Sequence, residues 1–88
     1  MDARRTVEAV WRMESPRLIA SLTRLVRDVG TAEEIAQDAF VLALEQWPRD
    51  GVPDNPGAWL TATAKHKAID RIRRERSQQS KYTQIAVD

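Results

Sequence analysis

Hydrophobic residues between positions 7 and 29 recur at spacings of three and four, which is the period of an amphipathic helix. Pro16 interrupts this stripe, and Ser15-Pro16 is typical of an N-cap followed by a first helical position, where a missing N–H is harmless. We expect helices near residues 3–14 and 16–29, or one helix kinked at Pro16, with Gly30 as a left-handed stop. The stripe consists of Val7, Val10, Trp11, Leu18, Ile19, Leu22, Leu25, Val26 and Val29.

A further helix is predicted to begin at Thr31. The sequence Thr31-Ala32-Glu33-Glu34 indicates a capping box, because the Thr31 hydroxyl can accept from the Glu34 N–H while the Glu34 carboxylate reaches the Thr31 N–H. We expect Pro48 to end this helix, since residues 48–57 contain three prolines and two glycines and should form a loop. Its apolar side would consist of Ile35, Ala36, Ala39, Phe40, Ala43 and Trp47.

The last helix is expected to begin at Asn55-Pro56, again an N-cap and a first helical position, and to run to about Arg76. The sequence shows no alternation typical of β-strands. We therefore predict an all-α fold, a compact bundle of three to four helices over residues 1–76, followed by a polar linker or tail over residues 77–88. The narrow apolar arc of the last helix consists of Leu60, Ala64, Ala68 and Ile72, with Thr61 and Ile69 beside it.

Composition then narrows the functional classes. The chain has 88 residues, of which 42% are hydrophobic and 31% charged, as in an ordinary single globular domain. The absence of cysteine excludes disulfides, thiolate metal sites and cysteine nucleophiles. With one histidine and no glycine-rich phosphate loop, an enzyme is the least fitting class, and we expect no cofactor. No apolar run approaches the roughly 18 residues of a membrane span, so we expect no membrane partner and a cytoplasmic location.

The formal charge of +1 conceals an uneven distribution. Residues 1–60 carry seven arginines and ten acids, net −3, whereas residues 61–88 carry seven bases and three acids, net +4. This pattern favours two partners, of which one is polyanionic. The plainer alternative is a solvated, charge-balanced helix end.

One face of the last helix combines an aromatic ring with several cations. A tryptophan among bases offers an unpaired nucleobase a stacking surface worth about 1–3 kcal/mol, and the cations neutralise phosphates. Each residue also has a simpler interpretation: Trp59 as a core residue, His66 as an ordinary exposed side chain, and the arginines as complements to the helix dipole. The face consists of Trp59, Thr63, His66, Lys67, Asp70, Arg73 and Arg74.

The predicted helix from Thr31 has the opposite sign over its first two turns, at Glu33, Glu34, Gln37 and Asp38. Acids favour a helix N-terminus for electrostatic reasons alone. The functional alternative is a patch for a basic protein partner. Glu34 and Asp38 are also spaced to bind a hard cation, but the sequence offers no clear third ligand.

Two long motifs resemble a known family. Ala32-Glu33-Glu34-Ile35-Ala36-Gln37-Asp38-Ala39-Phe40, followed by Trp47, resembles the second conserved region of extracytoplasmic-function sigma factors of bacterial RNA polymerase. The segment from Trp59-Leu60 to Arg73-Arg74 resembles the part that follows in the same domain, although Lys65-His66 stands where that family commonly has Arg-Asn. The resemblance covers roughly residues 5–76.

This resemblance implies a helical bundle with two binding surfaces. Its acidic helix would dock on the clamp coiled coil of the polymerase β′ subunit through Glu33, Glu34, Gln37 and Asp38. The loop Pro48–Asn55 would capture a flipped base of the minus-ten promoter element on the non-template strand, with Asp54 and Asn55 offering donors and acceptors. The DNA-binding residues would be Asp54, Asn55, Trp59, Thr63, His66, Lys67, Arg71, Arg73 and Arg74.

The expected function is promoter recognition and strand opening within an RNA polymerase holoenzyme, because binding an unpaired base shifts the duplex toward the open state. Core polymerase and promoter DNA are the implied partners, and an anti-sigma factor is a further candidate. The family also has a helix-turn-helix domain that nothing after Arg76 could form, so we expect a fragment of a longer protein. Two alternatives stay open: a free-standing helical module that binds duplex DNA, and a helical protein-interaction domain.

Overall fold

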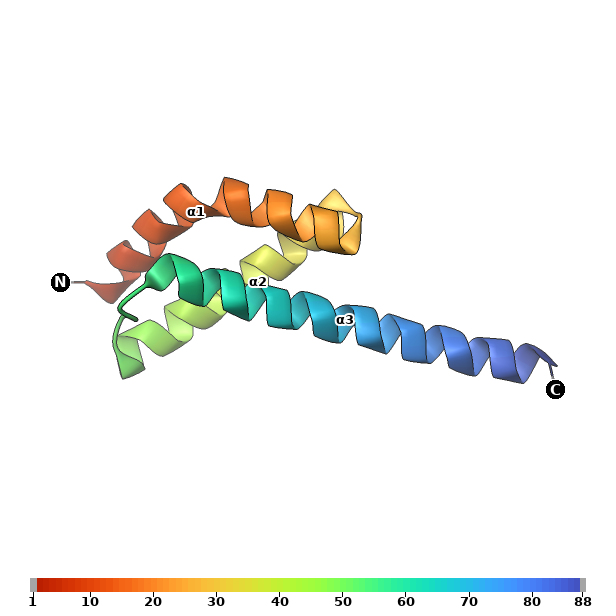
Figure 1. Cartoon of the computed structure of the whole chain (residues 1–88). Helices are drawn as coiled ribbons and strands as arrows, with labels where there is room; N and C mark the ends of the chain where they lie inside the picture. Colours follow the sequence, from red (N-terminus) through yellow and green to blue (C-terminus); the bar gives the residue numbers. More distant parts are fainter. Residues whose placement is uncertain (1, 88) are drawn as a thin grey trace.

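The computed structural model describes residues 2–87, with side chains through residue 81, and these residues form three helices (Figure 1). They are α1 (Ala3–Val26), α2 (Val29–Asp50) and α3 (Pro56–Val87), and no strand occurs within this range. The prediction of an all-α bundle of three to four helices is confirmed. Met1 and Asp88, the outer ends of the predicted segments 1–76 and 77–88, lie outside the described residues.

Helix α1 is continuous through Pro16, as the alternative of one kinked helix predicted. Proline has no N–H, so the carbonyl of Arg12 loses its intrahelical donor. Both residues are exposed, which lets water bind that carbonyl, and the axis of α1 bends about midway along its length (Figure 1). Asp2 is the N-cap, and its carboxylate accepts from the Arg4 N–H at 3.0 Å.

The turn between α1 and α2 differs from the prediction. Arg27, not Gly30, has the left-handed conformation, with φ 60°, and its N–H donates to the Thr23 carbonyl at 2.7 Å. Asp28 is the N-cap of α2, so Gly30 and Thr31 lie inside the helix and the predicted capping box at Thr31 is wrong. A carboxylate three residues before Thr31 provides the acceptor that α2 needs, and the helix therefore begins earlier.

The connection between α2 and α3 is shorter than the predicted loop Pro48–Asn55. Pro48 lies within α2, which continues to Asp50, so only residues 51–55 are non-helical. Proline near the C-terminus of a helix removes one hydrogen bond, and here residues 48–50 are exposed to water. Gly51 then ends the helix with φ 96°, a value that favours glycine, and its N–H donates to the Trp47 carbonyl at 2.9 Å.

Helix α3 begins as predicted but ends later. The Asn55 side-chain oxygen accepts from the Ala58 N–H at 3.1 Å, which confirms the cap. The predicted end near Arg76 is wrong, because α3 continues to Val87 and residues 77–87 contain no glycine or proline to stop it. Its C-terminal part projects beyond the other helices (Figure 1), giving a radius of gyration of 15.8 Å where a compact chain of this length has about 12 Å.

The core lies where the three helices meet. The aromatic rings of Trp11 and Phe40 pack α1 on α2 at a centroid distance of 4.8 Å. Small buried residues on α2 and α3 allow the two helices to approach closely. Leu25 and Val29 of the predicted stripe are 41% and 54% exposed, because the chain turns at Arg27 and the stripe does not continue in phase. The buried residues are Val7, Leu18, Leu22, Ala32, Ile35, Ala36, Ala39, Ala43, Trp47, Leu60, Ala64 and Ala68.

Candidate nucleic-acid and protein interfaces

The acidic surface predicted on α2 lies on the side of that helix opposite its core residues. The four side chains assigned to it, Glu33, Glu34, Gln37 and Asp38, are all exposed. Val41, 48% exposed, and Glu45 extend this surface by one and two further turns. The sequence analysis missed both, although spacings of four from Gln37 to Val41 and then to Glu45 place them on the same face. We call these six residues the acidic α2 face.

At the start of α2, Asp28 accepts hydrogen bonds from the Thr31 hydroxyl at 2.6 Å and from the Thr31 N–H at 2.9 Å. These two bonds, the hydroxyl bond first, lower the pKa of the Asp28 carboxyl, and the positive charge of Arg71 makes a smaller contribution in the same direction. The ionised carboxylate is therefore the favoured form at this helix N-terminus.

An ion pair joins the two predicted binding surfaces. The Arg71 guanidinium on α3 donates to the Glu34 carboxylate on α2 at 3.0 Å and lies 3.6 Å from the Glu75 carboxylate. The hydrogen bond to Glu34 is the main cause that raises the pKa of Arg71. Arg71, assigned to DNA by motif position, is thus held by a residue assigned to the polymerase.

The Arg71 side chain of this ion pair lines a groove of about 480 Å³ between α2 and α3. Three cations and three acids line this groove, so its charges largely balance. The cations all come from α3, whereas the acids come from both helices. The lining residues are Ile35, Asp38, Lys67, Asp70, Arg71, Arg74, Glu75 and Gln78. Of the predicted DNA-binding residues, Lys67, Arg71 and Arg74 therefore share one partly neutralised site.

The loop 51–55 brings two other predicted residues to the start of α3. Asp54 and Asn55 are both exposed. The side-chain oxygen of Asn55 is engaged by the Ala58 N–H, which leaves its amide N–H groups as donors. The Asp54 carboxylate is an acceptor beside them. The loop thus offers both donor and acceptor groups next to the first turn of α3.

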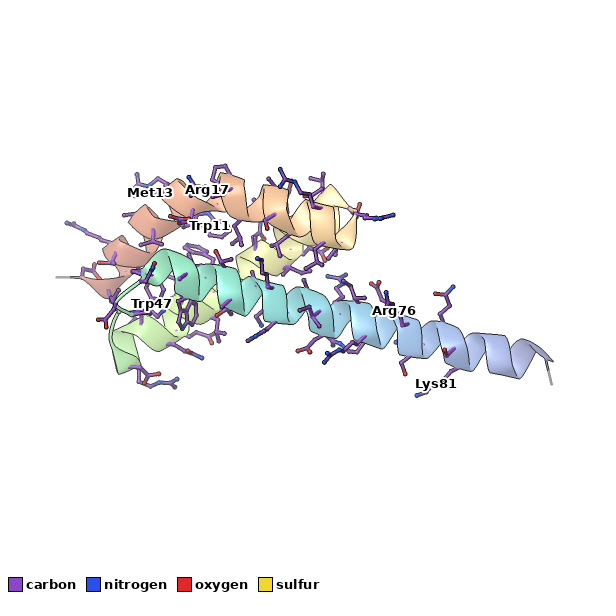
Figure 2. All side chains as sticks on the ribbon, viewed as in Figure 1. Trp11, Met13, Arg17, Trp47, Arg76 and Lys81 are labelled. Atoms are coloured by element: carbon purple, nitrogen blue, oxygen red, sulfur yellow. The ribbon has the colours of Figure 1, made fainter. Side chains whose placement is uncertain are left out.

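Trp59 is less accessible than a stacking platform requires. It is half-buried, and its ring meets Trp47 of α2 edge to face at a centroid distance of 5.3 Å. Trp47 is only 2% exposed and lies between α2 and α3 (Figure 2). The Trp47 ring nitrogen has no hydrogen-bond partner among the described residues. The core interpretation of Trp59 fits this packing better than that of a free aromatic surface.

The remaining predicted DNA-binding residues follow along α3. Thr63 is half-buried one turn after Trp59, whereas His66 and Arg73 are exposed. The structure brings together Asp54, Asn55 and Trp59 at one end of α3 and Lys67, Arg71 and Arg74 beside α2. It does not gather all nine residues into a single site.

The alternative of a cation site at Glu34 and Asp38 gains no support, since Glu34 binds Arg71. In the part of the chain that the structure describes, no group of three or more His, Cys, Asp or Glu side chains is placed to hold a metal ion. None of the helices described here is both long and apolar enough to cross a membrane.

The family model for sigma-70 region 2 matches residues 10–78, which include the acidic α2 face, the loop and most of α3. No solved structure matches the chain.

Several curated proteins are similar in sequence. The chain is 33% identical over 87 residues to the ECF RNA polymerase sigma factor SigK of Mycobacterium sp. (strain KMS), covering 91% of this chain and 44% of that protein. It is 35% identical over 72 residues to the ECF RNA polymerase sigma factor SigC of Mycobacterium tuberculosis (strain CDC 1551 / Oshkosh), covering 82% and 34%. An uncharacterized protein of Rhizobium meliloti (strain 1021) is 40% identical over 60 residues, covering 68% and 14%.

The chain thus spans less than half the length of these relatives. The family match nevertheless covers both motifs that the sequence analysis identified. The chain belongs to the sigma-70 region 2 family, as the region 2 domain of an extracytoplasmic-function RNA polymerase sigma factor.

Proposed function

We propose that this domain docks on the clamp coiled coil of the RNA polymerase β′ subunit and helps to open promoter DNA at the minus-ten element. The acidic α2 face carries this proposal. Within the described residues, Glu33, Gln37 and Asp38 make no ion pair or hydrogen bond, so they are available to a basic partner. Val41 adds an exposed apolar surface among them, and such a surface favours a protein partner over a purely solvated face.

Base capture would take place at the loop 51–55 and the first turns of α3. The amide of Asn55 and the carboxylate of Asp54 supply hydrogen-bonding groups of both kinds for a base edge. Pro53 and Pro56 restrict the backbone on either side of these residues, which lowers the entropy lost when a base is held. Binding one unpaired base of the non-template strand would then pull the promoter toward the open state.

The proposed partners follow from this division of the surface. RNA polymerase core would occupy the acidic α2 face, and promoter DNA would meet the loop, with His66, Arg73 and Arg74 on α3 contributing to the contact. An anti-sigma factor is a further candidate for the acidic α2 face, because covering it would prevent docking. No cofactor or catalytic step enters this function.

The docking half is tested by charge reversal on the acidic α2 face. The double variant Glu33→Arg, Asp38→Arg should weaken capture by a β′ clamp coiled-coil fragment, since reversed charges opposite a basic partner are repelled. Glu34→Arg is a poorer choice because it also breaks the bond to Arg71. Glu8→Arg is a single-reversal control, as Glu8 is an exposed acid of α1 that pairs with Arg4 among the described residues. Equal capture of the double variant and the control would refute docking at this face.

The base-capture half is tested by fluorescence anisotropy. The chain should bind a single strand with a non-template minus-ten sequence more tightly than the same DNA paired. One position should be selective, by about 1–3 kcal/mol per wrong base. Asp54→Ala should reduce that selectivity, whereas Asp50→Ala, which removes an exposed carboxylate beside Arg49, should not. Equal or tighter binding of duplex, with no sensitive position, would favour the alternative of a plain duplex-binding module.

A further inference from the structure

Helices α1 and α3 form a groove of about 460 Å³, and among the described residues its lining comes from these two helices alone. Leu25 of α1 and Ile69 of α3 make part of this lining aliphatic, and they are 41% and 38% exposed. Arg24 and Lys65, one from each helix, supply its two charges, and within the described residues neither makes an ion pair. Ser21 completes the lining of this surface, which we call the α1–α3 groove.

The lining favours a protein ligand over a nucleobase. It contains no aromatic ring, so an unpaired base would find no stacking surface there. The exposed aliphatic side chains favour burial against other apolar groups. The two cations require acids in the partner, because no acid lines the groove. A helix that carries an aliphatic residue with an acid one turn away on either side has this chemistry.

The acidic α2 face is a helix surface of this kind. Val41 lies near its middle, with Asp38 one turn before it and Glu45 one turn after it. All three side chains are exposed. Within the described residues, Asp38 and Glu45 make no ion pair or hydrogen bond. The order of acid, aliphatic residue and acid along α2 therefore complements the cations and aliphatic side chains of the α1–α3 groove.

The overall charge does not oppose contact between two copies of the chain. Its formal net charge is +1, and proteins with a net charge near zero associate more readily than strongly charged ones. The acidic α2 face and the α1–α3 groove carry opposite signs on different helices. Two copies can thus meet through attractive local charges while their overall repulsion stays small.

We propose that the chain self-associates, with the acidic α2 face of one copy seated in the α1–α3 groove of the next. The two surfaces share no residue, so the contact is heterologous, and a pair leaves one face and one groove free for further copies. One helix face in one groove is an interface at the small end of the known range. The association is therefore weak, with a dissociation constant of about micromolar or above.

Self-association would cover the surface that we propose to dock on the polymerase, so polymerase would compete with it. This consequence rests on the proposed function, whereas the self-association itself does not. Association measured on the chain alone is independent of polymerase docking, so a failure of docking leaves it standing.

Sedimentation velocity measures the association. The weight-average mass of the unaltered chain should rise above that of a monomer between about 10 µM and about 1 mM, where a weak interface becomes populated. Arg24→Glu, Lys65→Glu should reduce the association constant at least about tenfold, because it opposes like charges across the contact. The control Arg5→Glu, Arg12→Glu changes the net charge equally at exposed arginines outside the groove. It should change the constant less than about threefold.

Cross-linking tests which surfaces meet. The chain has no cysteine, so single thiols can be placed in the groove by Ser21→Cys and on the acidic α2 face by Gln37→Cys. A short bismaleimide should join a Ser21→Cys chain to a Gln37→Cys chain, and only rarely two chains of the same variant, because a heterologous contact brings unlike surfaces together. Met13→Cys, at an exposed position outside both surfaces, should give only background cross-linking with either variant.

Three results would overturn the proposal. The first is a chain that stays monomeric up to about 1 mM, which would leave the groove to an acidic segment of another protein. The second is an association weakened as much by Arg5→Glu, Arg12→Glu as by Arg24→Glu, Lys65→Glu. The third is cross-linking between like variants as efficient as that between the unlike pair. Circular dichroism checks the fold of each variant, and Arg24→Gln, Lys65→Gln is the milder substitute if charge reversal alters it.

Discussion

The two grooves that flank α3 have similar size but different electrostatic character: one is nearly balanced in charge and the other is positive. On the α2 side, Lys67, Arg71 and Arg74 meet three acids, and Arg71 is bound to Glu34 at 3.0 Å. On the α1 side, Arg24 and Lys65 meet none. The number of cations on a helix therefore says little about how many can bind a phosphate. What decides this is which acids surround each cation, both on α3 itself and on the helix packed beside it.

The contrast between the grooves originates in part in the helices beside α3, and in part in Asp70 and Glu75 of α3 itself. Helix α1 carries five arginines and two glutamates, whereas α2 carries five acids and one arginine. Because α3 packs against both of them, one of its flanks faces a basic neighbour and the other an acidic neighbour. The net charge of −3 over residues 1–60 averages these two helices and conceals the difference.

The largest expected effect is on the free energy of unfolding, and it concerns the aromatic packing between α2 and α3. Trp47→Ala removes a side chain that is 2% exposed and packs on Trp59, and it should cost about 3–5 kcal/mol of unfolding free energy. That is a large share of the roughly 5–15 kcal/mol typical of a domain. Denaturant unfolding followed by circular dichroism measures it. Trp47→Phe is the control and should cost less. A loss after Trp47→Ala no larger than that after Glu34→Gln would mean that the ion pair, not aromatic packing, holds this side.

On the α1 side, Gly57 of α3 lies close to the Glu14 side chain. A Cβ atom at this position would lie 3.1 Å from Glu14 Cδ and Oε1. Gly57→Val adds a branched side chain there and should destabilise the fold by about 1–3 kcal/mol, as overpacking does. Thermal unfolding of Gly57→Val alone and combined with Glu14→Ala measures the contact. Glu14→Ala should restore part of the loss, and an additive further loss would show that the two residues do not press on each other.

A smaller effect is expected from removing the acids that pair with Arg71 between α2 and α3. Glu34→Gln, Glu75→Gln removes both acids bonded to Arg71 and makes this flank resemble the α1 side. One freed phosphate contact should strengthen duplex binding by up to about eightfold near 0.1 M salt and steepen the salt slope by about 0.9. Anisotropy titrations with the unaltered chain as reference measure both. Glu8→Gln removes an exposed acid far from this groove and should strengthen binding less.

The smallest effect concerns Asp28, whose carboxylate begins α2. Hydrogen bonds from Thr31 lower its pKa below the ordinary 3.8, so they stabilise the fold above that pH and are lost as the pH falls through the lowered value. Asp28→Asn should therefore lower the melting temperature at pH 5 to 7, and its difference from the unaltered chain should shrink below pH 4. A difference that stays constant down to pH 2.5 would exclude titration of Asp28 as the cause.

Much of the helical architecture was predictable because its signals are local. The apolar spacing of α2 placed Ile35, Ala36, Ala39, Ala43 and Trp47 in the core, where the structure has them. Asn55-Pro56 marked the start of α3 correctly. Pro16 lies within one continuous helix, as one of the two predicted alternatives had it. Gly30 and Pro48 were misjudged as stops, because Asp28 caps α2 ahead of Gly30 and because packing of α2 outweighs the single hydrogen bond that Pro48 removes.

The candidate site was predictable in part. The acidic residues of α2 are exposed as the motif implied, although Val41 and Glu45, on the same face, went unnoticed. Trp59 was assigned to a basic exposed face, yet it is half-buried against Trp47. A helical wheel gives the direction of a side chain but not its neighbours, so it could not show which flank of α3 another helix covers.

The sequence by itself determined the fold class, the order of the helices and the family, because apolar periodicity, caps and motif residues act over a few positions along the chain. Tertiary structure alone decided which cations are free. Glu34 and Arg71 are 37 positions apart, and Arg24 and Lys65 are 41 apart. Charges so distant in sequence interact only after the helices have packed, since their attraction or repulsion falls with distance and is screened beyond about 10 Å.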